Sequence, residues 1–412
     1  FTPNWIVKYM VENTAGKIWL DKHPNSPIKN QMKYLVANDS DGKSESIINN
    51  VEELTLIDPA AGSGHILVEG FDLIYQMYME EYYTPEEAVA SILKNNLFGL
   101  DIDDRAAQLA TFAILLKAAN VYPDIWGKNW LPNVHAMPEV HDFSQQEVKD
   151  FLGDEGVDYV EELEVALRLM KQAKNLGSVM KLIISQDTRA FIETRFTEIE
   201  NTDYRDFNIE AIYQNIKSYI PVLLLLTKKY TSVVANPPYM TSGNFNAELL
   251  NYTIQEYSNS GNDLMTIFID VCHNLLLNKG LQGLITLHSW MFIDDFELLR
   301  GEVLRRQQII SLIHFGRGVF GSDFGSCSFI MNRNNTISKE QKGVYYKLFE
   351  MGKISLVANI EKLEKRFLEG YRKCIQKQVD FLMLPKNTIS PGLSFDTIDL
   401  LNKSTISKIG KF

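Results

Sequence analysis

Two short apolar segments in the first part of the chain each end in an aspartate and lead directly into a helical pattern. The first, residues 54–57, is followed by Asp58, and the second, residues 96–101, ends in Asp101. Strands that alternate with helices in this way pair in parallel, and their carboxyl ends share one edge of the sheet. The sequence therefore predicts an α/β fold with a doubly wound, mostly parallel sheet.

The rest of the chain supplies further elements of both kinds. We expect helices over 3–20, 63–81, 103–119, 263–277 and 296–305, a helix begun by the capping box Thr84-Pro-Glu-Glu87, and strands over 232–235, 284–287, 309–315, 326–331 and 344–348. The strands over 309–315 and 326–331 are joined by a glycine-rich turn, which makes them antiparallel. We therefore expect the sheet to finish with an antiparallel hairpin.

Three segments depart from this pattern. Residues 121–230 are polar and largely helical in pattern, with an acidic run over 142–164, and we interpret them as a helical insertion on the core. We expect residues 21–50 to form an exposed loop and residues 360–377 to form a basic helix. The acidic run would repel DNA, so we place it away from any DNA-binding cleft.

The charge and the cysteine content limit the partners and the compartment of the chain. The net charge is −11, so a globally basic surface for nucleic acid is absent, and such a partner would need local patches. Cys272, Cys327 and Cys374 form no C-x-x-C pair, which favours reduced thiols in the cytoplasm. We find no apolar run that could span a bilayer and no signal peptide. The start at Phe1, without Met, leads us to expect a fragment of a longer protein.

Asp58-Pro-Ala-Ala-Gly-Ser-Gly64 forms the first turn between a strand and a helix. Its glycines allow a tight turn and a close approach of the backbone to a ligand, although their spacing is not that of a dinucleotide fingerprint. Asp101 at the end of the next strand can accept hydrogen bonds from both ribose hydroxyls, or can simply stabilise a helix amino terminus. The two strand ends together favour a nucleoside ligand.

Asn236-Pro237-Pro238-Tyr239 is the most specific motif in the sequence. Proline cannot continue a parallel ladder, so this turn lies at the carboxyl edge of a strand, where ligands bind. The asparagine oxygen and a backbone carbonyl can accept both N–H bonds of a planar amine, and the aromatic ring can stack on it. These acceptors bind more strongly as the amine nitrogen attacks, so we expect the four residues to be catalytic.

These motifs together resemble N6-adenine DNA methyltransferases of the gamma arrangement, in which the cofactor motifs precede the catalytic motif. The resemblance is greatest to the methyltransferases of type 1 BREX phage-defence systems, which are related to Type IIG restriction–modification enzymes. It is carried by Phe1-Thr-Pro-Asn-Trp-Ile-Val, Asp58-Pro-Ala-Ala-Gly-Ser-Gly-His65, Gly99-Leu-Asp-Ile-Asp-Asp104 and Asn236-Pro-Pro-Tyr239, and it covers most of the chain.

The resemblance implies a Rossmann-like class I methyltransferase fold that uses S-adenosylmethionine, without a metal, to methylate adenine N6 in double-stranded DNA. The target base would be flipped out of the duplex. Other proteins of a phage-defence system are candidate partners. The implied division of the chain is 1–120 for the cofactor-binding half of the core, 121–230 for the helical insertion, 231–335 for the catalytic half and 336–412 for the start of a linker or recognition region.

The resemblance also implies roles for individual residues. The expected cofactor-binding residues are Thr2, Pro3, Asp58, Ala60, Gly62, Gly64, Asp101 and Ile102. Asn236, Pro237 and Tyr239 would hold and stack the target adenine, and Phe320 would complete the stack, with Phe324 as the competing residue. Asn175-Leu-Gly-Ser178 is a candidate for contact with the cofactor adenine, although the end of a helix explains it equally well.

The remaining polar residues have structural interpretations. We expect His288 and His314 to be core histidines. Four arginines are expected on a solvated helix face, with phosphate contact as the alternative: Arg300, Arg305, Arg306 and Arg317.

Two other functions stay open. The amide of glutamine is also a planar amine, so methylation of RNA bases or of protein glutamine fits the same motif. A cofactor-binding scaffold of a defence complex, without turnover alone, also fits the acidic chain.

Overall fold

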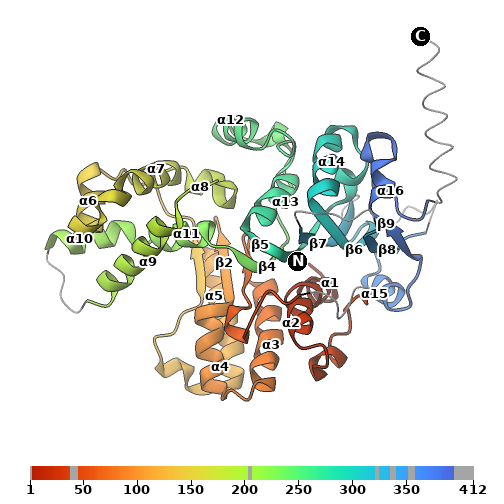
Figure 1. The fold of residues 1–412 in the computed structure, drawn as a ribbon, viewed down its shortest axis with the longest axis horizontal. Coiled ribbons are helices and arrows are strands. Elements are labelled where there is room, and N and C mark those ends of the chain that lie inside the picture. Colours follow the sequence, from red (N-terminus) through yellow and green to blue (C-terminus); the bar gives the residue numbers. More distant parts are fainter. Residues whose placement is uncertain are drawn as a thin grey trace, which may run out of the picture.

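One large sheet runs through the part of the chain that the structure describes (Figure 1). The structure is a computed structural model, and it describes residues 2–37, 45–202, 207–320, 324–334, 340–350 and 358–393. Nine strands within these ranges form the sheet in the order β3-β2-β1-β4-β5-β7-β6-β8-β9. They are β1 Leu56–Asp58, β2 Leu97–Asp101, β3 Asn133–Ala136, β4 Tyr230–Ala235, β5 Leu276–Leu287, β6 Gln307–Arg317, β7 Gly325–Arg333, β8 Lys342–Lys347 and β9 Lys373–Lys377.

The order of the strands reverses at β1. This strand pairs in parallel with β2 on one side and with β4 on the other, and Leu56 lies opposite both Leu97 and Ser232. From β1 the chain runs outward through β2 to β3, then returns to β4 and runs outward in the opposite direction. β7 lies antiparallel between β5 and β6. The predicted α/β fold with a mostly parallel sheet and a late antiparallel hairpin is confirmed.

Helices cover both faces of the sheet. The described helices are α1 Asn4–Val11, α2 Lys17–Lys22, α3 His65–Glu80, α4 Pro85–Ser91, α5 Asp104–Val121, α6 Gln145–Leu152, α7 Val160–Met170, α8 Ala173–Leu176, α9 Gln186–Glu200, α10 Phe207–Ile216, α11 Tyr219–Thr227, α12 Ala247–Glu256, α13 Leu264–Leu275, α14 Glu297–Arg306, α15 Ile360–Leu368 and α16 Val379–Leu382. Figure 1 shows α1 to α5 below the sheet and α13 and α14 above it. None of the helices in these ranges is long and apolar enough to cross a membrane.

The two faces of the sheet belong to two separate apolar cores because successive residues of a strand point to opposite sides. In β1, Leu56 packs with the core that α1, α3 and α5 cover, whereas Ile57 packs with the core under α13 and α14. Both side chains are fully buried. This explains why Leu56 and Ile57 are both apolar, instead of one apolar and one polar, as is typical of sheets covered on both faces.

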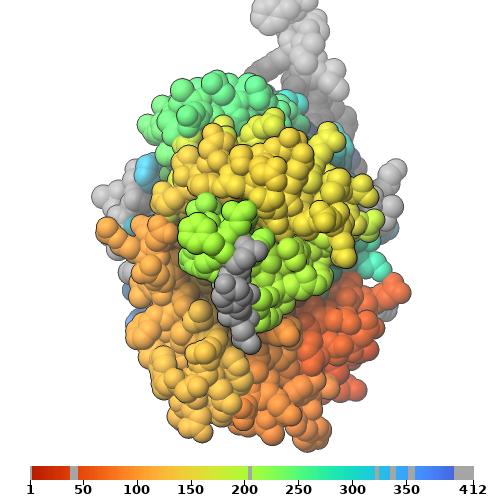
Figure 2. Space-filling view, turned by 90° about the vertical axis from the view of Figure 1, so that its left-hand side faces the viewer, coloured from red at the N-terminus to blue at the C-terminus, as the bar shows by residue number. Residues whose placement is uncertain are grey.

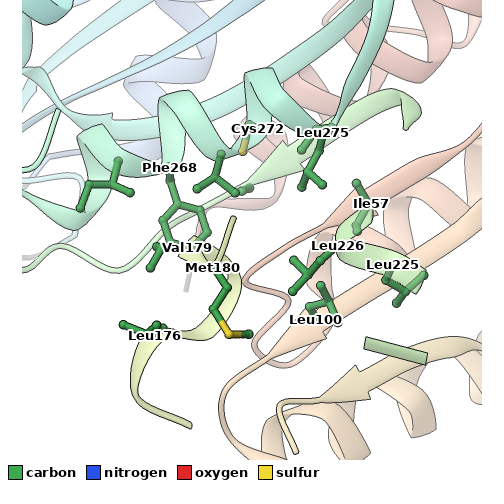
Figure 3. Close-up of a cluster of buried hydrophobic side chains, with 14 of the residues drawn as sticks. Ile57, Leu100, Leu176, Val179, Met180, Leu225, Leu226, Phe268, Cys272 and Leu275 are labelled. Atoms are coloured by element: carbon green, nitrogen blue, oxygen red, sulfur yellow. The ribbon is translucent and has the colours of Figure 1, made fainter. Parts of the chain in front are cut away.

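The helices α6 to α11 form a lobe on one face of the sheet. Figure 2 shows this lobe, in yellow and green, above the orange segments that include α5. A buried apolar cluster joins the lobe to the sheet and to α13 (Figure 3): Ile57, Leu100, Leu176, Val179, Met180, Leu225, Leu226, Phe268, Cys272 and Leu275. Burial of this apolar surface from several helices and two strands holds the lobe against the core.

The segment 121–230 is not entirely an insertion. Residues 133–136 form β3, which pairs in parallel with β2 and completes one edge of the sheet. The predicted, largely helical insertion over 121–230 did not include this strand. This strand has only four residues and carries polar Asn133 and His135, so its sequence lacks the apolar run that marks β1 and β4. The helical lobe begins only after it.

The last part of the described chain also departs from the prediction. The sheet does not finish with the hairpin, because β8 pairs in parallel with β6 and β9 pairs with β8. The predicted helix over 360–377 ends at Leu368, and residues 373–377 form β9 instead. Gly370, with φ of +67°, interrupts the helix, and pairing with β8 then fixes the strand.

The predicted exposed loop over 21–50 is partly buried. Residues 38–44 lie outside the described residues, but Ile28, Met32, Tyr34 and Val36 are buried. A π-helical turn at Glu12–Gly16 continues α1, and the buried Glu12 accepts a hydrogen bond of 2.6 Å from the backbone N–H of Tyr34. Side chains of the first helix therefore hold this segment, which local sequence pattern cannot show.

Leu100→Ala should destabilise the protein strongly because Leu100 is fully buried in the cluster that joins the lobe to the sheet. The expected loss is about 2–5 kcal/mol of unfolding free energy, from lost burial and an unfilled cavity. Urea denaturation followed by circular dichroism measures it. The matched control is Leu109→Ala on α5, where Leu109 is 52% exposed, and its expected change is below about 0.5 kcal/mol. Equal effects of the two substitutions would contradict the packing described here.

Candidate active site

The turn after β1 is built by its acid and its glycines. Oδ1 of Asp58 accepts a hydrogen bond of 3.0 Å from the backbone N–H of Ala60. Gly62 and Gly64 have φ of +52° and +80°, in the left-handed region that favours glycine. A Cβ atom at Gly64 would lie 2.9 Å from Cα of Ala110, so only glycine lets α3 begin this close to α5. At Gly62, by contrast, a Cβ atom would meet nothing within 4 Å.

Asp58 is a buried acid with an altered pKa. Its exposed fraction is 1%. The pKa of Asp58 is raised to about 8, mainly by burial; the hydrogen bond from Ala60 lowers this pKa, and the charge of Asp101 raises it. No basic side chain in the described ranges forms an ion pair with Asp58. The turn therefore contains a carboxyl group that would gain from a cationic partner.

Asp101 joins the ends of β1 and β2. Its Oδ2 accepts a hydrogen bond of 2.7 Å from the backbone N–H of Gly62, and its Oδ1 accepts one of 2.9 Å from Asp103. Ile102 follows and is 45% exposed. The structure thus brings the two predicted strand ends together, as parallel pairing of β1 and β2 requires.

The segment Asn175–Ser178 lies against these strand ends. The buried hydroxyl of Ser178 donates a hydrogen bond of 2.5 Å to the carbonyl of Pro59. A Cβ atom at Gly177 would lie 3.8 Å from Cδ1 of Ile102. The segment is the end of a short helix, as the structural interpretation expected, and it also adjoins the predicted cofactor residues. Its contact with a cofactor stays a prediction.

The motif after β4 is joined to the first residues of the chain. Nδ2 of Asn236 donates a hydrogen bond of 2.9 Å to Oγ1 of Thr2. Thr2 precedes Pro3, which caps α1 and accepts a hydrogen bond of 2.9 Å from Ile6 through its carbonyl. Pro237 is buried, whereas Pro238 is exposed. The hydrogen bond from Asn236 places Thr2 beside the Asn-Pro-Pro-Tyr motif.

Tyr239 lies between Asn236 and the late strands. Its hydroxyl donates to Oδ1 of Asn236 at 2.9 Å and lies 3.2 Å from the carbonyl of Ile285. The ring of Phe320 is 5.9 Å from that of Tyr239, with 66° between their planes. Phe324 is 66% exposed and has no described ring contact with Tyr239. Of the two candidate rings, Phe320 is therefore the one in contact with Tyr239.

Sequence reasoning missed the carbonyl of Ile285. A backbone oxygen on an apolar strand carries no sequence signal, and the pairing of β5 with β4 brings it within 3.2 Å of the Tyr239 hydroxyl.

Residues expected to be structural lie in other places. Nδ1 of His288 and Nε2 of His314 are 2.6 Å apart, and the stacked rings are partly buried between strands. Arg300 is fully buried, so the expectation of a solvated arginine is wrong at this position. Its guanidinium donates to the carbonyls of Trp290 at 3.0 Å and Lys386 at 2.8 Å, which tethers two loops.

A cavity of about 730 Å³ opens elsewhere, beyond β3 and between α5 and α11. It is lined mainly by apolar groups and includes Phe112, Met137 and Tyr219. It contains none of the predicted catalytic or cofactor residues. In the described part of the chain, His, Cys, Asp and Glu form no group of three that could hold a metal ion.

A family comparison agrees with this arrangement. Residues 95–320, more than half of the chain, match the model of the Eco57I restriction-modification methylase family. The chain belongs to this family.

Two curated relatives of this Eco57I-family chain resemble it over nearly its whole length. The adenine-specific methyltransferase BrxX of Escherichia coli O9:H4 (strain HS) is 30% identical over 95% of this chain and 34% of that protein. The adenine-specific methyltransferase PglX of Lacticaseibacillus casei (strain Zhang) is 30% identical over 98% of this chain and 35% of that protein. The predicted resemblance is confirmed, and the chain spans about a third of the length of these relatives.

Solved structures show the same fold. The ATP-dependent Type ISP restriction-modification enzyme LlaBIII bound to DNA aligns with a TM-score of 0.52 and 13% identity, over 91% of this chain and 21% of that one. The DrdV–DNA complex aligns with a TM-score of 0.51 and 14% identity, over 96% of this chain and 32% of that one. The Eco57I-family chain therefore has the predicted Rossmann-like methyltransferase fold.

Asp58→Asn should change stability in a way that depends on pH. The pKa of Asp58 is raised from 3.8 to about 8, so between these values the folded chain holds a proton that the unfolded chain has lost. Wild-type stability therefore falls as pH rises through this window. Asparagine does not titrate, so the variant does not lose stability in this way. The Tm of the variant minus the Tm of the wild type should therefore increase from pH 4.5 to pH 8.5. Thermal unfolding followed by circular dichroism measures the difference, and a difference independent of pH would contradict the burial of a protonated Asp58.

Proposed function

We propose that this chain is the methyltransferase part of an enzyme that transfers a methyl group from S-adenosylmethionine to adenine N6 in DNA. The observation that carries the proposal is the hydrogen-bonded cluster of Thr2, Asn236 and Tyr239 at the same sheet edge as Asp58 and Asp101. In this proposal the enzyme marks host DNA in a phage-defence system of the BREX type. The names of the curated relatives support the reaction and the setting.

The turn after β1 fits the cofactor. Asp58 is a buried carboxyl group without a described basic partner, which suits the ammonium group of an amino acid. The open space at Gly62 lets a ligand approach the backbone, and Asp101 keeps free lone pairs for ribose hydroxyls. S-adenosylmethionine would supply an activated methyl group bound to a sulfonium. The residues proposed to hold it are Thr2, Pro3, Asp58, Ala60, Gly62, Gly64, Asp101 and Ile102.

The motif after β4 fits an aromatic amine. Oδ1 of Asn236 accepts a hydrogen bond in the structure, so it is turned toward Tyr239 and away from Thr2. As an amine nitrogen attacks, its hydrogens become more acidic, and this acceptor then stabilises the transition state more than the ground state. Pro237 and Pro238 fix the turn, while Tyr239 and Phe320 stack on the base. A base inside a duplex cannot reach them, so it must leave the stack.

Asn236→Ala should abolish methylation, since it removes the acceptor for the amine, with an expected loss of about 10²–10³ in kcat. The measurement is modification-sensitive sequencing of DNA from cells that carry the full-length gene. The matched control is Asn251→Ala, on the exposed face of α12, which should keep the wild-type mark. N6-methyladenine that persists at one sequence motif in the Asn236→Ala strain would overturn the assignment of this residue. If the wild type methylates RNA or glutamine, or if the Asn236→Ala strain keeps the cellular role of the protein, one of the two other functions replaces DNA methylation as the proposal.

Asp101→Ala should weaken cofactor binding because hydrogen bonds to a charged group contribute about 1.5–3 kcal/mol each. We expect at least a tenfold higher Kd for S-adenosylmethionine in isothermal titration calorimetry. Asp124→Ala, at an exposed position, is the control and should bind like the wild type. Unchanged binding by Asp101→Ala would place the cofactor elsewhere in the fold.

A further inference from the structure

A short segment of the helical lobe holds the turn after β1 through one buried hydroxyl group. Residues 177–181, which we call the strap, follow α8 directly. Within the strap, Ser178 is 5% exposed, and its hydroxyl donates a hydrogen bond of 2.5 Å to the carbonyl of Pro59. Pro59 lies between Asp58 and Ala60, two of the residues proposed to hold the cofactor. The lobe therefore contacts the backbone of the turn, although the strap comes 119 residues later in the chain.

Hydrogen bonding can fix Pro59 only through its carbonyl, because proline has no backbone N–H. Pro59 is buried, and a buried carbonyl that loses its donor bears the full cost of its removal from water. We therefore expect the backbone to shift when the donor is lost, and Asp58 and Ala60 to shift with it. The 3.0 Å hydrogen bond from the Ala60 N–H to Asp58 lies on the same stretch of backbone. Ser178 thus acts on the geometry of the turn through Pro59.

The strap is itself fixed from its other side. The hydroxyl of Tyr257, which follows α12, donates a hydrogen bond of 2.7 Å to the carbonyl of Val179. The hydroxyl of Tyr252, on α12, accepts one of 2.8 Å from the backbone N–H of Lys181. Val179 and Met180 belong to the buried apolar cluster that joins the lobe to the sheet (Figure 3). Because hydrogen bonds and apolar packing both anchor the strap, it offers the turn a rigid point of attachment.

We infer that Ser178 is a positioning residue for the cofactor: through Pro59 it keeps the backbone of residues 58–60 in the conformation that binds S-adenosylmethionine. The inference rests on the proposed function and gives the helical lobe a part in the affinity for the cofactor. This role differs from the direct contact with the cofactor adenine for which residues 175–178 are a candidate. The Ser178 hydroxyl is buried and donates its one proton to Pro59, so it acts through the turn.

Ser178→Ala removes the hydroxyl and leaves the anchors of the strap in place. We expect its Kd for S-adenosylmethionine to be about 3- to 10-fold higher, since binding has to restore the conformation of the turn. The KM for the cofactor should rise by a similar factor. The kcat at saturating cofactor and DNA should stay within about twofold of the wild type, because the bound cofactor has already ordered the turn. Ser178→Thr keeps a hydroxyl and should bind the cofactor at least about threefold more tightly than Ser178→Ala.

The matched control is Ser328→Ala on β7, three strands away from β1 in the sheet. Ser328 is fully buried, and its hydroxyl donates a hydrogen bond of 2.9 Å to the carbonyl of Leu284. This variant loses the same kind of bond and should be destabilised to a similar degree, but it should bind S-adenosylmethionine like the wild type. The control therefore separates a positioning role of Ser178 from a general loss of stability.

The measurements are isothermal titration calorimetry of the full-length enzymes with S-adenosylmethionine and the rates of DNA methylation over a range of cofactor concentrations. A wild-type Kd in Ser178→Ala overturns the inference, as does an equal increase in Ser328→Ala or a Ser178→Thr variant that binds no better than Ser178→Ala. A wild type that binds the cofactor and methylates DNA leaves the proposed function intact in each of these cases. A wild type that does neither overturns both.

A second measurement needs no substitution. Saturating S-adenosylmethionine should slow amide hydrogen exchange of the full-length wild type in the strap as well as in the turn over residues 58–64. A ligand that stabilises the turn also stabilises the segment bonded to it. Residues 360–368 of α15 are the control and should exchange at an unchanged rate. Slower exchange in the turn without any change in the strap overturns the inference.

Discussion

The parallel pairing of β1 with β2 and with β4 is the constraint on which the rest of the structure depends. Parallel strands end at the same edge of a sheet, so Asp58, Asp101 and Asn236 meet although they are far apart in sequence. The strand order reverses at β1, and sheets of this class bind ligands outside the strand ends at such a reversal. Because helices cover both faces of this sheet, its edge is the one place where polar side chains of these strands can act.

Hydrogen bonds then tie separate segments to this edge. Gly62 donates to Asp101, Ser178 donates to the carbonyl of Pro59, and Asn236 donates to Thr2. Each bond contributes only about 0.5–1.5 kcal/mol to stability, so their main effect is to fix geometry. Asp58, by contrast, destabilises the site when it is ionised, because burial disfavours its charged form and raises its pKa. Groups with altered pKa values of this kind concentrate where proteins bind ligands.

The parts of the fold that could be predicted are those with a local cause. The capping box at Thr84 begins α4 as expected, and the apolar segments that end at Asp58 and Asp101 form β1 and β2. The failures have a common cause, which is that distant partners decide the local structure. β3 is a strand because β2 lies beside it, and β9 replaces the end of a predicted helix because β8 offers an unpaired edge.

The same distinction between local causes and distant partners applies to the candidate site. The sequence by itself determined the types of residue and their order, because strand, turn and proline chemistry act over a few neighbouring residues: the glycine turn, the acid of β2 and Asn-Pro-Pro-Tyr. Only the tertiary structure decided which groups face one another. The register between β4 and β5 brings the Ile285 carbonyl to the Tyr239 hydroxyl, and the start of α1 brings Thr2 to Asn236. Hydrogen bonding acts over about 3 Å in space and is indifferent to separation along the chain, so these contacts leave no pattern in the sequence.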